Sequence, residues 1–159
     1  MKNTIIAVAF IFATLCFSSC GVKKTLVKST DECAVLGFQS GSNVAADDAK
    51  FIAGVFAVNF HPANYRVIET ERIEKELDKS GYEQAKLMKQ QACEVGRRLG
   101  VKLVVLGSIN KLMDEYVVDV QVIDSVKGIT VAFEGNAFQK SDSGREMSIL
   151  AKKLSSKLQ

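Results

Sequence analysis

The period of the hydrophobic pattern changes along this chain of 159 residues, and that change restricts the fold more than any other feature. Between Glu83 and Leu99, apolar residues recur every three or four positions, which predicts an amphipathic helix. Residues 103–106 are apolar without alternation, which predicts a strand buried on both faces. Residues 118–122 and 129–133 alternate, which predicts two strands. The residues expected to share a face in these segments are Met88, Ala92, Val95 and Leu99, then Val118, Val120 and Val122, then Ile129, Val131 and Phe133.

The remaining segments complete an α/β pattern. Residues 34–38 and 65–69 read as strands, and a helix with Asp47 and Asp48 in its first turn lies between them and ends by Pro62. Its expected core stripe is Phe51, Ile52, Val55 and Phe56. Thr70 and Gly81 bound the next helix, Gly100 ends the helix after it, and Asp114-Glu115 and Lys127-Gly128 sit at hairpin turns. A last helix opens with a capping-box pattern from Ser143 to Glu146 and buries Met147, Leu150, Leu154 and Leu158.

These segments predict one α/β domain over residues 33–159, with a mixed sheet of about five strands and three to four helices in the order βαβααβββα. Nearly balanced charge, a hydrophobic content of 47% and a single proline exclude a disordered chain. The formal net charge is only +3, so we expect no nucleic-acid partner.

The N-terminus reads as an export signal that stops at a lipid-attachment cysteine. Lys2 precedes an apolar run over residues 5–17 that is too short to span a membrane, and Ser18 and Ser19 lead into Cys20. We therefore expect a signal peptide over residues 1–19 and a tether over 20–32 that is lipidated, with palmitate among its acyl chains, at Cys20. Ordinary secretion and an uncleaved anchor are the alternatives.

Two further cysteines would enter an oxidising compartment after export. Cys93 lies five residues after Met88, about 140° around a helix, which places it away from the apolar stripe. A disulfide between Cys33 and Cys93 is one interpretation. The other is a thiol covered by the tether or by a neighbouring element.

No residue pattern indicates a reaction. His61 is the only histidine, which excludes a histidine-based triad and a zinc site built mainly from imidazole. The acids do not form a defined pair, so we expect no enzyme activity, no cofactor and no metal.

Two places are candidates for binding a partner. The loop that contains Ser40, Ser42 and Asn43 follows a strand and precedes a helix, where backbone N–H groups can hold an anion, although a plain turn has the same composition. Basic residues on the amphipathic helix form a second candidate surface, and a solvated helix face looks the same. Its residues are Lys86, Lys89, Arg97 and Arg98.

Three passages, residues 34–38, 94–109 and 122–128, resemble the CsgG-like and LpoB-like family of bacterial envelope lipoproteins, whose fold is similar to that of the TolB N-terminal domain. The matching positions are mostly glycines and apolar residues, so the resemblance concerns the fold. The chain has no spare pair of long alternating hairpins, so the resemblance does not extend to the membrane barrel of curli-type channels.

The resemblance implies a non-enzymatic protein held by its lipid at the outer membrane and facing the periplasm. We expect it to act as an accessory or scaffold that binds another envelope protein. The alternatives are a subunit of a self-assembling secretion or envelope ring and a small-ligand-binding protein.

Overall fold

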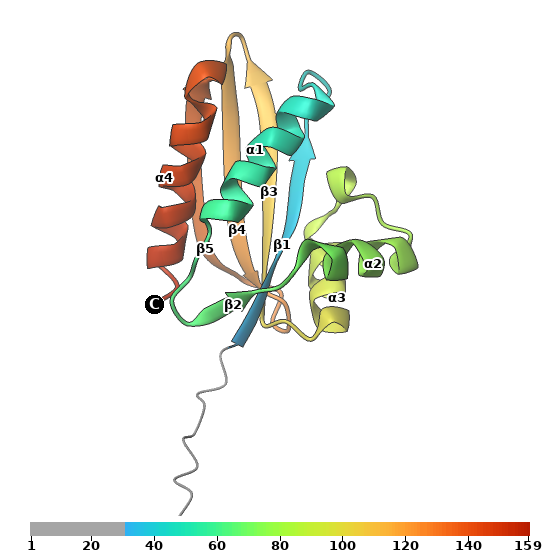
Figure 1. Cartoon of the computed structure of the whole chain (residues 1–159). Helices are drawn as coiled ribbons and strands as arrows, with labels where there is room; N and C mark the ends of the chain where they lie inside the picture. The colour runs from blue at the N-terminus through green and yellow to red at the C-terminus, as the bar shows by residue number, and fades with distance from the viewer. Residues whose placement is uncertain (1–30) are drawn as a thin grey trace, which may run out of the picture.

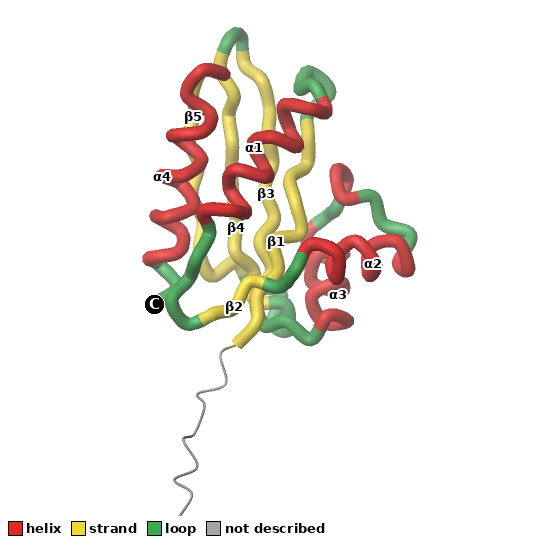
Figure 2. The backbone as a smooth tube through the Cα atoms, in the orientation of Figure 1, coloured by secondary structure: helices red, strands yellow, loops and turns green. Residues whose placement is uncertain are grey.

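The computed structural model describes residues 31–159 as one five-stranded sheet with helices on both faces (Figures 1 and 2). The predicted signal peptide and Cys20 lie outside the described residues. The strands are β1 (Asp31–Ser40), β2 (Tyr65–Val67), β3 (Leu103–Leu112), β4 (Glu115–Asp124) and β5 (Thr130–Gln139). The helices are α1 (Ala46–Asn59), α2 (Thr70–Ser80), α3 (Lys89–Leu99) and α4 (Ser143–Ser156), with short 3₁₀ turns η1 (Gln84–Lys86) and η2 (Lys140–Asp142). This confirms the predicted mixed α/β fold and its element order.

The sheet has the strand order β2-β1-β3-β4-β5. β1 runs parallel to both neighbours, whereas β3, β4 and β5 are antiparallel. β1 begins at Asp31, so it includes two residues that the sequence placed in the tether. It pairs with β2 only from Asp31 to Cys33 and then continues to Ser40 with β3 on one side alone. This difference in strand length leaves most of one edge of β1 without a strand neighbour.

The core consists of two hydrophobic clusters, because β1 and β3 are apolar on both faces. Leu103, Val104, Val105 and Leu106 are all buried, as their continuous apolar run predicts. The larger cluster joins α1 and α4 to the sheet and includes Phe56, Phe60, Val105, Val118, Met147 and Leu154. The smaller cluster joins α2 and α3 to the other face and includes Leu36, Ile73, Leu77, Val95, Val104 and Ile123.

One helix prediction was wrong in its start and one in its face. α3 begins at Lys89 rather than at Glu83, and Met88 is its N-cap residue with 60% of its surface exposed. Ala92, Val95 and Leu99 are buried as predicted. In α1, Ile52 and Phe56 are buried, but Phe51 is 58% exposed because it lies on the side of the helix that faces solvent.

The predicted caps were confirmed at the helix C-termini and wrong at two N-termini. At the start of α2 the N-cap residue is Glu69, and Thr70 is already part of the helix. Gly81 and Gly100 end α2 and α3 with φ of 66° and 72°, values that favour glycine. Before α4, the Ser143 hydroxyl donates to the Lys140 carbonyl instead of capping the helix. The Glu146 carboxylate accepts from Asn136, so the expected capping box does not form.

The strand β5 buries the face opposite to its apolar alternation. Ala132 and Phe138 point toward α4, whereas Val131 and Phe133 are 46% and 54% exposed. Ile129 precedes the strand and is also exposed. Because α3 covers β3 and not β5, this outer face has no helix above it in the described part of the chain. Among residues 31–159, no helix is both long and apolar enough to cross a membrane.

Candidate partner-binding groove

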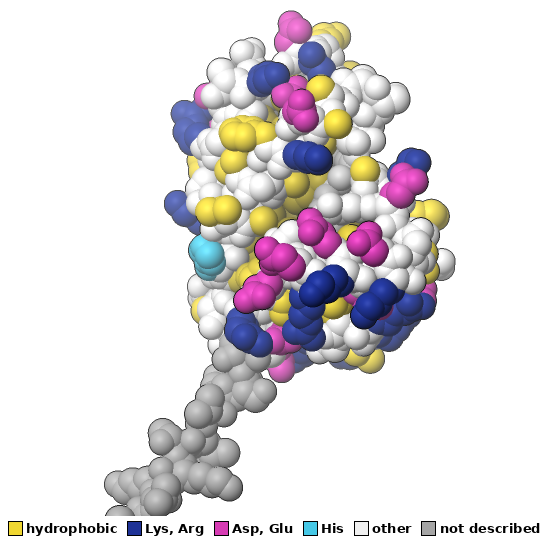
Figure 3. All heavy atoms as spheres, turned by 45° about the vertical axis from the view of Figure 1, so that its right-hand side comes forward, with side chains coloured by type: hydrophobic (Ala, Val, Ile, Leu, Met, Phe, Trp, Pro, Cys, Tyr) yellow, Lys and Arg dark blue, Asp and Glu magenta, His cyan; other side chains and the backbone are white. Residues whose placement is uncertain are grey.

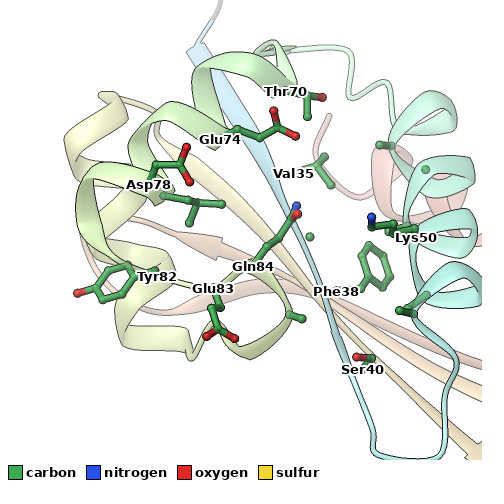
Figure 4. A pocket seen from close by; sticks show the side chains of 18 residues that line it. Val35, Phe38, Ser40, Lys50, Thr70, Glu74, Asp78, Tyr82, Glu83 and Gln84 are labelled. Carbon is green, nitrogen blue, oxygen red and sulfur yellow. The ribbon is translucent and has the colours of Figure 1, made fainter.

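A groove of about 740 Å³ lies at the β1 edge, between α1 on one side and α2 with residues 82–85 on the other (Figure 4). Its floor comes from β1, where Val35, Gly37, Phe38 and Ser40 line it. The groove exists because β2 ends at Val67 and no other strand of the described residues lies beside the rest of β1. Residues of both core clusters, such as Phe38 and Leu77, therefore line the groove.

The α1 wall of the groove is made of small side chains at helical spacing. Ala46, Ala49, Ala53 and Ala57 line it together with Gly54, at which an added Cβ would meet nothing within 4 Å. Side chains this small fill little of the space beside α1, so the groove stays open along this wall. Lys50 is the one cation among the groove's lining residues, and it comes from α1.

The opposite wall is acidic. Glu74 and Asp78 lie one helical turn apart on α2 and line the groove with Glu83, and Figure 3 shows acidic side chains across the middle of this side of the molecule. Glu83 pairs with Lys86 at 2.7 Å, whereas Glu74 and Asp78 form no ion pair with any described residue. Like charges at this spacing repel each other, so the wall favours a cation placed beside them.

The side chain of Gln84 covers part of the β1 edge. Its Nε2 donates to the Leu36 carbonyl at 2.8 Å, and a Cβ at Gly37 would lie 2.6 Å from the Gln84 side chain. Gly37 has a φ of 125°, so a side chain there would also strain the backbone. Gln39 donates in the other direction, to the Leu87 carbonyl. Residues 84–87 are thus held to β1 by side chains alone, without a backbone ladder.

Tyr82 lines the groove, and its hydroxyl is fixed by an ionic cluster outside it. Its hydroxyl donates to Glu94 on α3 at 2.8 Å, and this bond raises the pKa of Tyr82. The same bond, followed by that from Arg98, lowers the pKa of Glu94. The cluster holds α2 and α3 together and keeps the α2 wall in place.

The predicted basic surface is divided in the structure. Lys86 lies on η1 beside Glu83, not on α3. Lys89 donates to the Thr130 hydroxyl at 3.0 Å and Arg97 to the Ser125 carbonyl at 3.0 Å, both near the β4–β5 turn. Arg98 contacts Glu76 on α2 at 3.8 Å. These residues do not form one strip along a single helix, and their role in binding stays a prediction.

The predicted loop at residues 40–43 is tied to β3. The Gly41 N–H donates to the Ile109 carbonyl at 2.8 Å, and the Asn43 amide both donates to the Lys111 carbonyl and accepts from the Lys111 N–H. Asn43 thus continues the sheet with its side chain. Ser40 lines the groove, whereas Ser42 is exposed and lies outside the groove lining.

Both described cysteines are free and buried, so the Cys33–Cys93 disulfide is absent from the structure. Cys33 belongs to the cluster under α1 and α4, and Cys93 to the cluster on the opposite face. The buried free thiol of Cys93 agrees with the alternative of a covered thiol, whereas its placement away from the apolar stripe was wrong because the angle was measured from Met88, which is exposed. Burial raises the pKa of Cys33 to about 12.

The only histidine of the chain lies away from the groove lining. His61 is exposed at the end of α1, and its backbone N–H donates to the Ser155 hydroxyl at 3.0 Å. Among residues 31–159, no three metal-binding side chains cluster together.

Sequence reasoning missed Glu74, Asp78 and the groove itself. One signal was present: alanines at positions 46, 49, 53 and 57 form a small-residue stripe at spacings of three and four on α1. A stripe of this kind indicates either close helix packing or open space. Which of the two applies here depends on where β2 ends, and the sequence analysis predicted that end two residues too late.

Neither a family model nor a curated protein matches the sequence. Solved structures share the fold. Lipoprotein GNA1162 from Neisseria meningitidis matches with a TM-score of 0.56 at 12% identity, over 79% of this chain and 99% of that one. The LpoB C-terminal domain from Salmonella enterica matches with a TM-score of 0.52 at 13% identity, over 69% of this chain and 83% of that one.

TolB from Acinetobacter baumannii also matches, with a TM-score of 0.53 at 12% identity over 81% of this chain, which corresponds to 28% of TolB. At these identities the likeness concerns the fold alone. The described domain therefore has the fold of the LpoB C-terminal domain, and the matches support the LpoB-like part of the resemblance rather than CsgG in particular.

Proposed function

We propose that this protein is a non-enzymatic accessory lipoprotein that binds another component of the bacterial cell envelope in the groove between α1 and α2. The lipid at Cys20 would hold the domain at the outer membrane, facing the periplasm. Anchoring of this kind raises the effective concentration of a binding domain near partners in or at the same membrane.

The observation that carries this proposal is the groove's combination of an apolar floor with unpaired charges. Val35 and Phe38 offer apolar surface below, and Glu74, Asp78 and Lys50 offer charges that have no ion-pair partner among the described residues. Concave sites with a few polar groups at the rim are where proteins bind their ligands. The fold shared with a lipoprotein, GNA1162, supports the anchored arrangement.

The experiment is a cross-linked pull-down from envelopes with the wild type and two groove variants. Gly54→Phe places a ring in the groove mouth, whereas Gly54→Ala fills almost no space there and serves as the control. A specific envelope protein that is captured by the wild type and by Gly54→Ala but lost with Gly54→Phe supports the proposal. Equal capture by all three variants contradicts the assigned site.

A Cys20→Ala variant tests the anchor in the same preparation. We expect the wild type to incorporate labelled palmitate and this variant to incorporate none. If both proteins incorporate the label alike, Cys20 is not the lipidation site.

Self-assembly is the second candidate function, and the outer face of β5 is the observation that favours it. β5 is the last strand of the sheet, and Val131 and Phe133 are exposed beside its open edge. Exposed edges of this kind pair with other chains unless they are protected. A concentration-dependent mass in light scattering that is lost in Phe133→Lys would favour assembly over monomeric binding.

A further inference from the structure

The unpaired part of β1 is a template for one more strand. From Val35 to Ser40, β1 pairs with β3 on one side, and on the other side it faces the groove. Backbone N–H and C=O groups at a sheet edge bind extended segments by continuing the ladder. Six residues of extended chain cover about 20 Å, so this edge accepts a short segment.

The place of a strand neighbour is partly taken by a side chain. Gln84 donates to the Leu36 carbonyl, as a backbone N–H of an added strand would do. It reaches this position from an exposed residue of η1, and Gly37 leaves room for it. A flexible side chain of this kind satisfies the edge in the free protein and can be displaced by a ligand that offers the same donor.

The charges along the edge select the ligand. The lining residues include three acids, Glu74, Asp78 and Glu83, and one cation, Lys50. On the same helix, Glu76 does not line the groove and pairs with Lys79 and Arg98. Glu83 pairs with Lys86, whereas Glu74 and Asp78 face the groove without an ion-pair partner among the described residues, which is the charge pattern that a basic ligand completes.

From these contacts we infer that the groove binds an extended segment of a partner protein, with lysine or arginine alternating with apolar side chains, which adds to the β1 edge as a strand. The inference rests on the proposed function, since it names the partner chemistry for the same groove. Alternate side chains of an added strand point in opposite directions. One set would reach the apolar wall of α1 and Phe38, and the other would reach Glu74 and Asp78.

The test uses a short fluorescein-labelled peptide in which lysine and valine alternate, and a matched peptide with glutamate in place of lysine. Binding to the full-length protein in detergent is followed by anisotropy. We expect the lysine peptide to bind at least about tenfold more tightly than the glutamate peptide. The Glu74→Gln/Asp78→Asn variant should weaken the lysine peptide about five- to tenfold, since two exposed ion pairs are lost. Glu69→Gln/Glu71→Gln, at the N-terminus of the same helix and outside the groove, should not weaken it.

Hydrogen exchange of the β1 amides separates strand addition from nonspecific charge binding, since the latter would not protect these amides. With the lysine peptide bound, amides within residues 35–40 should gain protection, and Gly54→Phe should abolish both binding and protection. Binding without protection of β1 would overturn strand addition, and so would the absence of binding by either peptide.

The chain's own residues 21–30 contain Lys23, Lys24 and Lys28 and no acid, so a synthetic peptide of this segment is the alternative occupant. Tighter binding by this peptide than by the lysine–valine peptide would overturn the assignment to a partner. The pull-down with the Gly54 variants is independent of these peptides. If no peptide binds but the pull-down captures an envelope protein that Gly54→Phe loses, strand addition is refuted and the proposed function stands.

Discussion

Two glycines in helix interiors should respond in opposite directions to the same substitution. In Gly96→Ala, the new Cβ would lie 2.5 Å from Val104 Cγ1 and 2.8 Å from Ser125 Cβ, and both of these residues are fully buried. In Gly54→Ala, the new Cβ meets nothing within 4 Å, because the residue faces the groove. The pair therefore tests the close packing of α3 on β3 and the openness of the groove at once.

The magnitudes follow from packing and helix preference. Alanine is favoured over glycine in a helix interior by about 0.5–1 kcal/mol, so Gly54→Ala should stabilise the protein by about that amount. Overpacking a rigid core costs about 1–3 kcal/mol, so after the same helix gain Gly96→Ala should destabilise by about 1–2 kcal/mol. Because the helix gain applies to both variants, they should differ by the overpacking cost alone, about 1–3 kcal/mol.

Urea unfolding followed by circular dichroism measures both changes, with an unchanged slope required for a valid comparison. The melting temperatures of the two variants should differ by on the order of 10 °C. If Gly96→Ala were as stable as the wild type, α3 would not approach β3 as closely as described. If Gly54→Ala were destabilising, the α1 wall would not be open at this position.

Three further variants or conditions test other parts of the structure. Asp48 binds Lys140 at 2.8 Å and accepts from the Tyr116 hydroxyl, and these bonds hold its pKa below the ordinary value of 3.8. A carboxylate whose pKa is lowered in the folded state stabilises the protein at pH values above its unfolded pKa, and this stabilisation is lost as the pH falls through the folded pKa. Asp48→Asn should therefore be less stable than wild type at pH 7. In an acid titration, the difference in stability between the two proteins should vanish below pH 3.8. An equal deficit at every pH would contradict this. Asn43→Ala removes the bonds to Lys111 and should cost about 1 kcal/mol in urea unfolding, whereas Ser42→Ala should cost nothing measurable. Cys33, with a pKa of about 12, should resist iodoacetamide at pH 8 until urea is added, as peptide mass spectrometry would show; labelling of the folded protein would contradict its burial.

The element order was predictable because the period of the apolar pattern is set by local structure. The run at residues 103–106 could only be buried on both faces, and Gly81 and Gly100 stood where helices need a left-handed residue. Met88 and Phe51 were misassigned because a spacing of three or four residues fits more than one helix phase. Val131 and Phe133 share a face as predicted, but alternation does not say which face a helix covers, and α4 covers the other one.

The groove could not be predicted, since it depends on contacts between segments far apart in the sequence. It requires β2 to end after three residues, α1 to carry alanines toward α2, and Gln84 to reach Leu36. Glu74 and Asp78 read in the sequence as ordinary solvated acids. Their lack of ion-pair partners becomes visible only when α2 is placed beside β1 and α1.

The most direct test of the groove as the binding site is photocross-linking in living cells. Benzoyl-phenylalanine would be introduced at Ala85, an exposed residue that lines the groove, and separately at Ile149, which is 41% exposed on α4 outside it. The account predicts a specific cross-linked envelope protein from position 85 and none from position 149. A cross-link from position 149 alone, or the same product from both positions, would contradict it.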